Sequence, residues 1–423
     1  MGDRIILHCD LNCFYASVEL LEHPELRGAP AAVCGDPRQR HGVILAKNEA
    51  AKAAGVRTGE SVWQASQRCP GLHLLPAHHE KYRHYSRLVN EVYQSYTDRV
   101  ERFGIDESWL DVTGTLHLFG GDGRALADEI RRAVREELGL TVSVGVSFNK
   151  VFAKMGSDYK KPDATTVISR ENYKELLWPL PVTDLLFVGR AAARVLAGYG
   201  VRTIGDLARF DRAALGDILG KGGLALHDYA AGEDRAPVIP ARDLPGPKSV
   251  GSGLTYPRNL AGWAELRSAL TELADEVAVR LRKHALKCTT LQVTIRDPSF
   301  KDICRQKKLA APTYVSRDLA EAAMELVKAS WSEKAPVRAL TVTAQNLVEE
   351  GDAGEQLDLF AANAAPRRDK LEKLEKAMDG IRDKYGRAAI SPASQLHKED
   401  KRPIPPGPPE EVRSPGRKPG PSA

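Results

Sequence analysis

Three acidic residues stand beside apolar stretches of the sequence, where a carboxylate is costly to bury. Asp10 follows the apolar run 4–9, and Asp106 and Glu107 lie together in the segment FGIDESWLD. A buried carboxylate requires a balancing cation. Converging carboxylates are the oxygen ligands that Mg²⁺ prefers, and they bridge the ions in two-metal sites for phosphoryl transfer. The pattern therefore favours a divalent-metal site formed by Asp10, Asp106 and Glu107.

The adjacency of Asp106 and Glu107 leaves a second interpretation open. Adjacent residues on a regular strand face opposite sides of the sheet. Both can reach one site only if twist, a bulge or a strand end redirects one of them. Otherwise the two are surface acids on a strand, and Asp111 is an equally good candidate ligand.

Strands and helices alternate in the first part of the chain, and these elements must position the acids. The run 4–9 predicts a buried strand that ends at Asp10, and 141–147 alternates valines with small polar residues, which predicts another strand. Between them, 124–138 has an apolar residue at every fourth position, as in an amphipathic helix. This order predicts an α/β or α+β sheet domain over about residues 1–165. Short strands are expected at 31–35 and 43–46, and mainly helix over 48–98.

A second sheet domain is expected in the later part of the chain. Helix and strand patterns repeat there, with helices at 266–281 and 317–331 and strands at 291–296 and 338–344. Two such units suggest a small sheet with two helices on one face. The other face is left open and polar, with Thr294 and Arg296 pointing outward, and it could contact a phosphate backbone.

Length and composition exclude several classes of protein. With 423 residues the chain is long enough for about two to four domains, and 42% hydrophobic residues suffice for buried cores. No apolar run approaches the roughly 20 residues that span a bilayer, and the N-terminus becomes charged too early for a secretory signal, which excludes membrane and secreted proteins. The cysteines form no C-x-x-C pair, which argues against a zinc site or disulfides and indicates a reducing cytosol. They are expected to be small core residues at positions Cys9, Cys13, Cys34, Cys69, Cys288 and Cys304.

Basic residues are concentrated in one segment. The whole chain has 61 Lys and Arg against 56 Asp and Glu, whereas residues 242–345 hold 17 against 11, a local surplus of six. Such a concentration is expected of a module that binds a polyanion, although an ordinary solvated surface gives the same count. Residues 391–423 are dense in Pro, Gly and charge, so we expect them to be disordered.

Four segments follow one another in an order typical of a known family. They are HCDLNCFYASVE (8–19), KNEAAKAAGV (47–56), GIDESWLD (104–111) and SVGVSFNKVFAKMGSDYKKP (143–162). Together they resemble the Y-family translesion DNA polymerases, in particular the bacterial DNA polymerase IV type. The resemblance extends over residues 1–390, and four ordered motifs are far more specific than one.

The resemblance implies a metal site and its chemistry. Asp10, Asp106 and Glu107 match the family's metal-binding carboxylates, with the backbone carbonyl of Leu11 as a further ligand. The family often has a second acid at the position of Asn12, but that position is not a ligand, so metal binding is expected to survive. Two Mg²⁺ ions, with Mn²⁺ as a substitute, would activate the primer 3′-hydroxyl and neutralise the triphosphate during an in-line displacement.

The resemblance also assigns nucleotide contacts. Tyr15, after Phe14, occupies the steric-gate position, where an aromatic ring under the deoxyribose excludes a 2′-hydroxyl; without the family, this ring is typical of a core residue. Lys52 and Lys161 match basic positions near the incoming triphosphate. Glu49 stands where the family commonly has Tyr. An acid beside a triphosphate is unfavourable, so either Glu49 turns away or the register differs by one residue, and Glu49 is left out of the site.

Contacts to DNA and to a sliding clamp are implied as well. The segment 185–207 resembles a helix–hairpin–helix, whose turn at Gly189 and Arg190 offers backbone N–H groups to a DNA phosphate. Phe187 stands where Gly is usual, and a hairpin that binds nothing is the alternative.

A charged helix is expected at 368–385. The segment QLDLF resembles the clamp-binding peptide of bacteria, with contacts from Gln356, Leu357, Leu359 and Phe360.

The implied fold is a multidomain α+β right-hand polymerase. It has a ferredoxin-like palm, small fingers, a helical thumb with the helix–hairpin–helix, and a C-terminal little-finger domain made of a four-stranded sheet with two helices. The expected boundaries are palm 1–19 and 76–165, fingers 20–75, thumb 166–235, linker 236–242, little finger 243–347, clamp-binding peptide and charged helix 348–390, and disordered tail 391–423.

The implied activity is template-directed, error-prone DNA synthesis by a cytoplasmic monomer without a proofreading exonuclease. A site with small fingers tolerates damaged templates, because loose packing around the nascent base pair discriminates less. One alternative is a catalytically inactive scaffold in a DNA-damage mutasome, against which the three acids weigh. Another is a catalytic subunit that requires accessory proteins. A nucleotide cyclase on a similar palm is disfavoured by the helix–hairpin–helix and the clamp peptide.

Overall fold

The computed structural model describes residues 3–36, 42–352, 365–386 and 389–390. The chain divides into two compact units, Met1–Gly246 and Pro247–Ala423. The QLDLF segment at 356–360 and the tail 391–423 lie outside the described residues. Within the described ranges, no helix combines the length and the hydropathy that a membrane crossing requires. Four free cysteines, Cys9, Cys34, Cys69 and Cys288, are buried as expected, whereas Cys13 is half-buried and Cys304 is exposed.

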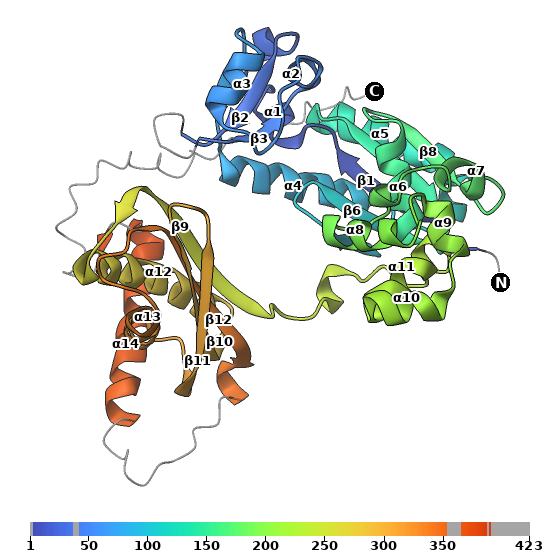
Figure 1. Ribbon diagram of the computed structural model, residues 1–423. Helices are drawn as coiled ribbons and strands as arrows, with labels where there is room; N and C mark the ends of the chain where they lie inside the picture. Colours follow the sequence, from blue (N-terminus) through green and yellow to red (C-terminus); the bar gives the residue numbers. More distant parts are fainter. Residues whose placement is uncertain (1–2, 37–41, 353–364, 387–388, 391–423) are drawn as a thin grey trace. The chain divides into compact units, whose positions relative to one another are not determined.

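The first unit contains a five-stranded sheet (Figure 1), and the predicted acids lie in or directly beside two of its strands. Its strands are β1 (Ile6–Leu11), β5 (Val100–Arg102), β6 (Glu107–Asp111), β7 (Val142–Ser147) and β8 (Thr165–Ile168). They lie in the order β5-β6-β1-β7-β8, antiparallel except for the parallel pair β7–β8. The strands predicted at 4–9 and 141–147 are confirmed, and β1 continues one residue past Asp10.

The alternating side chains of β1 face two different sets of helices. Leu7 and Cys9 point into the core that α4 (His79–Gln94) and α5 (Gly123–Leu138) cover, and α5 confirms the predicted helix. His8 and Asp10 point to the other face, where α6 (Lys150–Tyr159) packs on β1 and β7. Because the period of a strand is two, Asp10 lies on the face that α6 covers.

A glycine allows α6 to approach this sheet closely. The ideal Cβ position of Gly145, on β7, lies 1.9 Å from the Ala153 carbonyl oxygen and 2.5 Å from the Ser157 nitrogen. Gly156 on α6 faces Gly145 in turn. No side chain fits between them, so the backbone of α6 packs directly on that of β7. This contact sets the distance between α6 and Asp10.

Two further parts of the first unit have hydrophobic clusters of their own. Residues 31–36 and 42–76 form a three-stranded sheet with two helices around Ile44 and Ala65, and residues 173–231 form short helices around Leu196 and Leu207. The short strands predicted at 31–35 and 43–46 are confirmed. The remaining strands and helices of the unit are β2 (Ala31–Cys34), β3 (Ile44–Lys47), β4 (His73–Pro76), α1 (Phe14–Glu19), α2 (Glu49–Ala53), α3 (Val62–Arg68), α7 (Tyr173–Leu177), α8 (Arg190–Gly198), α9 (Ile204–Arg209), α10 (Arg212–Leu219) and α11 (Lys221–Ala231).

The second unit contains an antiparallel four-stranded sheet with two helices on one face. Its elements are β9 (Ser249–Leu260), α12 (Trp263–Lys283), β10 (Leu286–Arg296), β11 (Asp302–Thr313), α13 (Ser316–Ser330) and β12 (Val337–Glu349). The strands lie in the order β11-β10-β12-β9. Leu291, Val293 and Ile295 of β10 are buried in the core beneath the helices. The predicted four-stranded sheet with two helices is thus confirmed, and β9 and β11 are the two strands whose positions the residue pattern did not locate.

A third helix of the second unit is held by buried ion pairs. This helix, α14 (Ala365–Tyr385), confirms the charged helix predicted at 368–385. The side chain of Arg282 is 4% exposed; it pairs with Glu375 and lies 2.6 Å from Asp379. Because these charges are out of water, removal of one partner leaves an uncompensated buried charge.

Candidate active site

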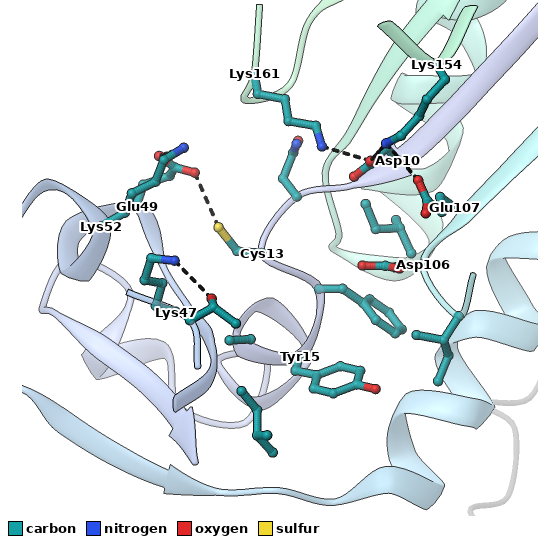
Figure 2. A pocket seen from close by; sticks show the side chains of 17 residues that line it. Asp10, Cys13, Tyr15, Lys47, Glu49, Lys52, Asp106, Glu107, Lys154 and Lys161 are labelled. Carbon is teal, nitrogen blue, oxygen red and sulfur yellow. Dashed lines mark hydrogen bonds and ion pairs between the residues drawn. The ribbon is translucent and has the colours of Figure 1, made fainter. Parts of the chain in front are cut away.

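The end of β1 and the beginning of β6 lie side by side, which brings the three predicted acids together. In the register of these strands Asp10 pairs with Glu107, and the Leu11 amide donates to the Asp106 carbonyl at 3.0 Å. Asp106 lies in a bend just before β6, so the strand end redirects it. All three acids line one cavity of about 560 Å³ (Figure 2). Leu11 belongs to the lining of the same cavity.

Two polar residues near these acids have structural roles. The Asp111 carboxylate accepts hydrogen bonds from the Thr113 amide at 3.1 Å and its hydroxyl at 2.6 Å. Asp111, the last residue of β6, therefore holds the turn that follows this strand, and it is absent from the described lining of the cavity. The Asn12 side chain donates to the Ser143 hydroxyl at 2.9 Å and accepts from the Asp163 amide at 2.8 Å. Asn12 thus joins two chain segments beside the cavity.

Two lysines pair with Asp10 and Glu107. The Lys154 ammonium lies 2.9 Å from Asp10 and 2.8 Å from Glu107, and the Lys161 ammonium lies 2.8 Å from Asp10. Both lysines also pair with Asp158. Lys161 was expected from the sequence, but Lys154 and Asp158 were not. The signal available was their spacing, because residues four apart on a helix share one face.

The acids differ in how readily they lose a proton. Burial raises the pKa of Glu107, but the close polar contacts with His8 and Lys154 outweigh this effect and bring it to about 2. Burial, together with the charges of Asp10 and Glu107, raises the pKa of Asp106. No basic side chain in the described part of the chain forms an ion pair with Asp106. A cation beside Asp106 would relieve this repulsion.

The donor set around the acids fits a hard divalent ion. Ligand atoms of His8, Asp10 and Glu107 lie within 4.8 Å of one another, and Asp106 adds a third carboxylate to the cavity. His8 is fully buried, with Nδ1 2.8 Å from the Ser157 hydroxyl and Nε2 3.4 Å from Glu107. Because Mg²⁺ prefers carboxylate oxygen to imidazole, the three acids fit this ion, and His8 orients Glu107 from behind. His8 was not expected, although it shares a face of β1 with Asp10.

Phe14 and Tyr15 begin α1 at the border of the cavity. Phe14 is 3% exposed and belongs to the core, whereas Tyr15 is partly exposed. The ring of Tyr15 stacks on that of Tyr82 from α4, with 4.0 Å between centroids and 13° between planes. Tyr15 therefore packs against the core with one side of its ring and also lines the cavity. Its interpretation as a core residue and its interpretation as a steric gate are thus compatible.

Glu49, which the sequence left out of the site, also lines the cavity and so does not turn away from it. It begins α2, and its carboxylate accepts a hydrogen bond from the Cys13 thiol at 3.3 Å and lies 3.5 Å from the Lys52 ammonium. Both partners line the same cavity (Figure 2). Burial and the Glu49 carboxylate raise the pKa of Cys13 to about 11, so the thiol stays protonated as a donor.

The residues predicted to contact DNA are at least partly exposed. Gly189 precedes α8 with φ at −79°, and both Gly189 and Arg190 are exposed. The left-handed residue of this turn is Phe187, with φ at 71° and a side chain 59% exposed. Position 187 is therefore the one in this turn whose backbone conformation would favour glycine. In the second unit, Thr294 and Arg296 lie on the open face of the sheet, and Arg296 forms two 2.7 Å hydrogen bonds to Asp302 on β11.

The fold matches that of a known class of polymerase. A solved structure of a Y-family DNA polymerase chimera superposes with a TM-score of 0.72 at 25% sequence identity, covering 82% of this chain and 99% of the chimera. The first unit, with its acids at the end of β1 and the start of β6, and the second unit, with its four-stranded sheet, thus have the architecture of Y-family DNA polymerases.

Sequence relatives narrow this class to a family. Residues 9–158 match the impB/mucB/samB family, and residues 247–359 match the C-terminal domain of the same family. A DNA polymerase IV of Acetivibrio thermocellus is 48% identical over 384 residues, 90% of this chain and 95% of the relative. A DNA polymerase IV 1 of Bacillus subtilis is 38% identical over 94% of both chains. The chain belongs to the impB/mucB/samB family, and the resemblance to translesion polymerases of the DNA polymerase IV type is confirmed.

Proposed function

We propose that this chain is a template-directed DNA polymerase of the error-prone translesion type, which adds deoxynucleotides to a primer 3′ end. The observation that carries the proposal is the meeting of Asp10, Asp106 and Glu107 in one cavity, which Tyr15 also lines. Membership in the family supports it, because the relatives are named DNA polymerase IV.

Each cavity residue has a role in this proposal. The three acids and the Leu11 carbonyl would hold two Mg²⁺ ions, which supply activation of the primer hydroxyl and neutralise the pyrophosphate leaving group. Lys161 and Lys154 offset negative charge beside the acids, and Lys52 does so at the other end of the cavity lining. Tyr15, next to Phe14, packs under the sugar and rejects ribonucleotides.

The domain boundaries and the macromolecular contacts expected from the sequence are part of the same proposal. Three separate hydrophobic clusters in the first unit support a palm, fingers and thumb. Exposed backbone at Gly189 and Arg190, and the open face with Thr294 and Arg296, would contact the DNA backbone. Residues 356–360 would bind a sliding clamp, and we propose a cytoplasmic monomer.

Primer extension with Mg²⁺ by the full chain tests the catalytic assignment. Asp106→Ala should lower the extension rate by at least about a hundredfold, because it removes a metal-binding carboxylate. Asp98→Ala, at an exposed acid paired only loosely with Arg242 at 3.5 Å, is the matched control and should leave the rate unchanged. Equal activity in wild type and Asp106→Ala would refute the assignment. Wild-type protein that extends no primer would favour an inactive scaffold instead.

A further inference from the structure

A second tyrosine supports the ring of Tyr15 from the side of the core. Tyr82 on α4 is fully buried, and its ring lies parallel to that of Tyr15 at 4.0 Å. His79 packs edge-on against both rings, with centroids 5.9 Å from Tyr15 and 5.7 Å from Tyr82. Because protein interiors are close-packed, Tyr15 can retreat from the cavity only if Tyr82 moves.

A buried carboxylate holds Tyr82 in place. The Tyr82 hydroxyl donates to Glu19 Oε1 at 2.5 Å and accepts from the His78 amide at 3.1 Å. Glu19 is 2% exposed, and it also contacts the Lys81 ammonium and the His78 ring, each at 3.0 Å. These hydrogen bonds outweigh burial and lower the pKa of Glu19, whereas burial and then Glu19 raise the pKa of Tyr82. At neutral pH a neutral phenol therefore donates to an ionised carboxylate.

The helical spacing brings the side chains of Tyr15, Glu19 and Tyr82 into one connected cluster. Tyr15 and Glu19 lie four residues apart on α1 and so share one face of that helix. Tyr82 spans both of them, with its ring on Tyr15 and its hydroxyl on Glu19. A tyrosine has two side-chain torsions, and contacts at both ends of the side chain leave neither of them free.

We propose that Tyr82, held by Glu19, is a positioning residue for sugar selection by Tyr15. This inference rests on the proposed polymerase function and concerns the choice between deoxyribonucleoside and ribonucleoside triphosphates. The Tyr15 ring excludes a 2′-hydroxyl only if the ring cannot be displaced from its position. Its stacking on Tyr82 prevents that displacement. Among the described residues, Tyr82 and Glu19 are outside the cavity lining, so both act through Tyr15.

Single-nucleotide incorporation by the full chain with Mg²⁺ tests this role, with a deoxyribonucleotide and the matching ribonucleotide compared. Tyr82→Phe keeps the ring and removes the hydroxyl, and Glu19→Gln keeps the shape and removes the charge. We expect each to lower the ratio of kcat/KM for the deoxyribonucleotide to kcat/KM for the ribonucleotide about tenfold, because Tyr82→Phe removes and Glu19→Gln weakens a buried hydrogen bond to a charged group. The kcat/KM for the deoxyribonucleotide should stay within about threefold of wild type.

A matched control separates this effect from general loosening of the palm. Tyr96 also offers its hydroxyl to a glutamate, Glu129, at 3.4 Å, and the described lining of the cavity does not include it. Tyr96→Phe should leave the ratio unchanged. In a Tyr15→Ala background, Tyr82→Phe should have no further effect on the ratio, because the ring it supports is gone.

Two results would overturn the inference. One is an unchanged ratio in both Tyr82→Phe and Glu19→Gln, whether kcat/KM stays at its wild-type value or falls equally for both nucleotides, as a merely structural role would produce. The other is a further change of the ratio in the Tyr15→Ala background. Wild-type protein that extends no primer would refute the polymerase function together with this inference. Normal extension with an unchanged ratio would remove only the role of Tyr82.

Discussion

Replacement of Gly145 by alanine tests how the packing of α6 positions the site. An added Cβ would lie 1.9 Å from the Ala153 carbonyl oxygen, whereas ordinary contact begins at 3.4 Å, so α6 must retreat by about 1.5 Å. Lys154 moves with the helix, away from Asp10 and Glu107. Displacement of catalytic groups by about 1 Å can cost a hundredfold in rate. We therefore expect primer extension by Gly145→Ala to fall by about a hundredfold.

The same clash should lower stability. Overpacking costs about 1–3 kcal/mol when side chains can adjust, and here the obstacles are backbone atoms, so we expect the upper end of this range. For a unit of this size, about 3 kcal/mol lowers Tm by roughly 6–12 °C. The assay is thermal unfolding followed by circular dichroism, with primer extension measured below the transition of the variant.

Gly114→Ala is the matched control for this experiment. Its added Cβ would meet no atom within 4 Å, so we expect Tm and extension close to wild type. If Gly145→Ala has the same Tm and the same primer-extension rate as Gly114→Ala, then α6 does not pack on β7 as described. The inference that α6 positions Lys154 would then be wrong.

Two further predictions concern charges in each unit. Glu49→Gln removes a negative charge from the cavity and frees Lys52 from its ion pair. The KM for a deoxyribonucleotide, measured by steady-state kinetics, should therefore fall about threefold. A higher KM would contradict this role of Glu49. Arg282→Met removes the cation that buried Glu375 requires and should destabilise the second unit by about 3–5 kcal/mol in denaturant unfolding. Arg267→Met, at an exposed position of α12, is the control; equal stability of the two variants would show that the ion pairs contribute nothing.

Elements with one buried face were predictable from the sequence. The helix at 124–138 and the strand at 291–296 carry apolar residues at one clear period, because one side of each is buried. The family resemblance implied four strands in the second unit, but the residue pattern did not locate β9 and β11, which lie at the two edges of their sheet. β11 carries Arg305, Lys307 and Lys308, as suits an edge exposed to solvent, and shows no apolar alternation.

The candidate site was predictable in its residue types but not in its geometry. Asp10, Asp106 and Glu107 follow from their places beside apolar runs, yet only the start of β6 at Glu107 shows how two adjacent acids share one site. Lys154 becomes visible once α6 is packed on β1, because its partners are far away in the sequence. The left-handed conformation of Phe187 has no signal in residue type, since that conformation normally favours glycine.

The docking of α14 determines where the second unit can be truncated for expression. The family match of the second unit stops at residue 359, but Glu375 and Asp379, the partners of Arg282, lie beyond it. A fragment truncated at that boundary would lose α14 and, with it, both carboxylates that pair with the Arg282 guanidinium. Expression of the second unit alone should therefore extend to Tyr385, the last residue of α14.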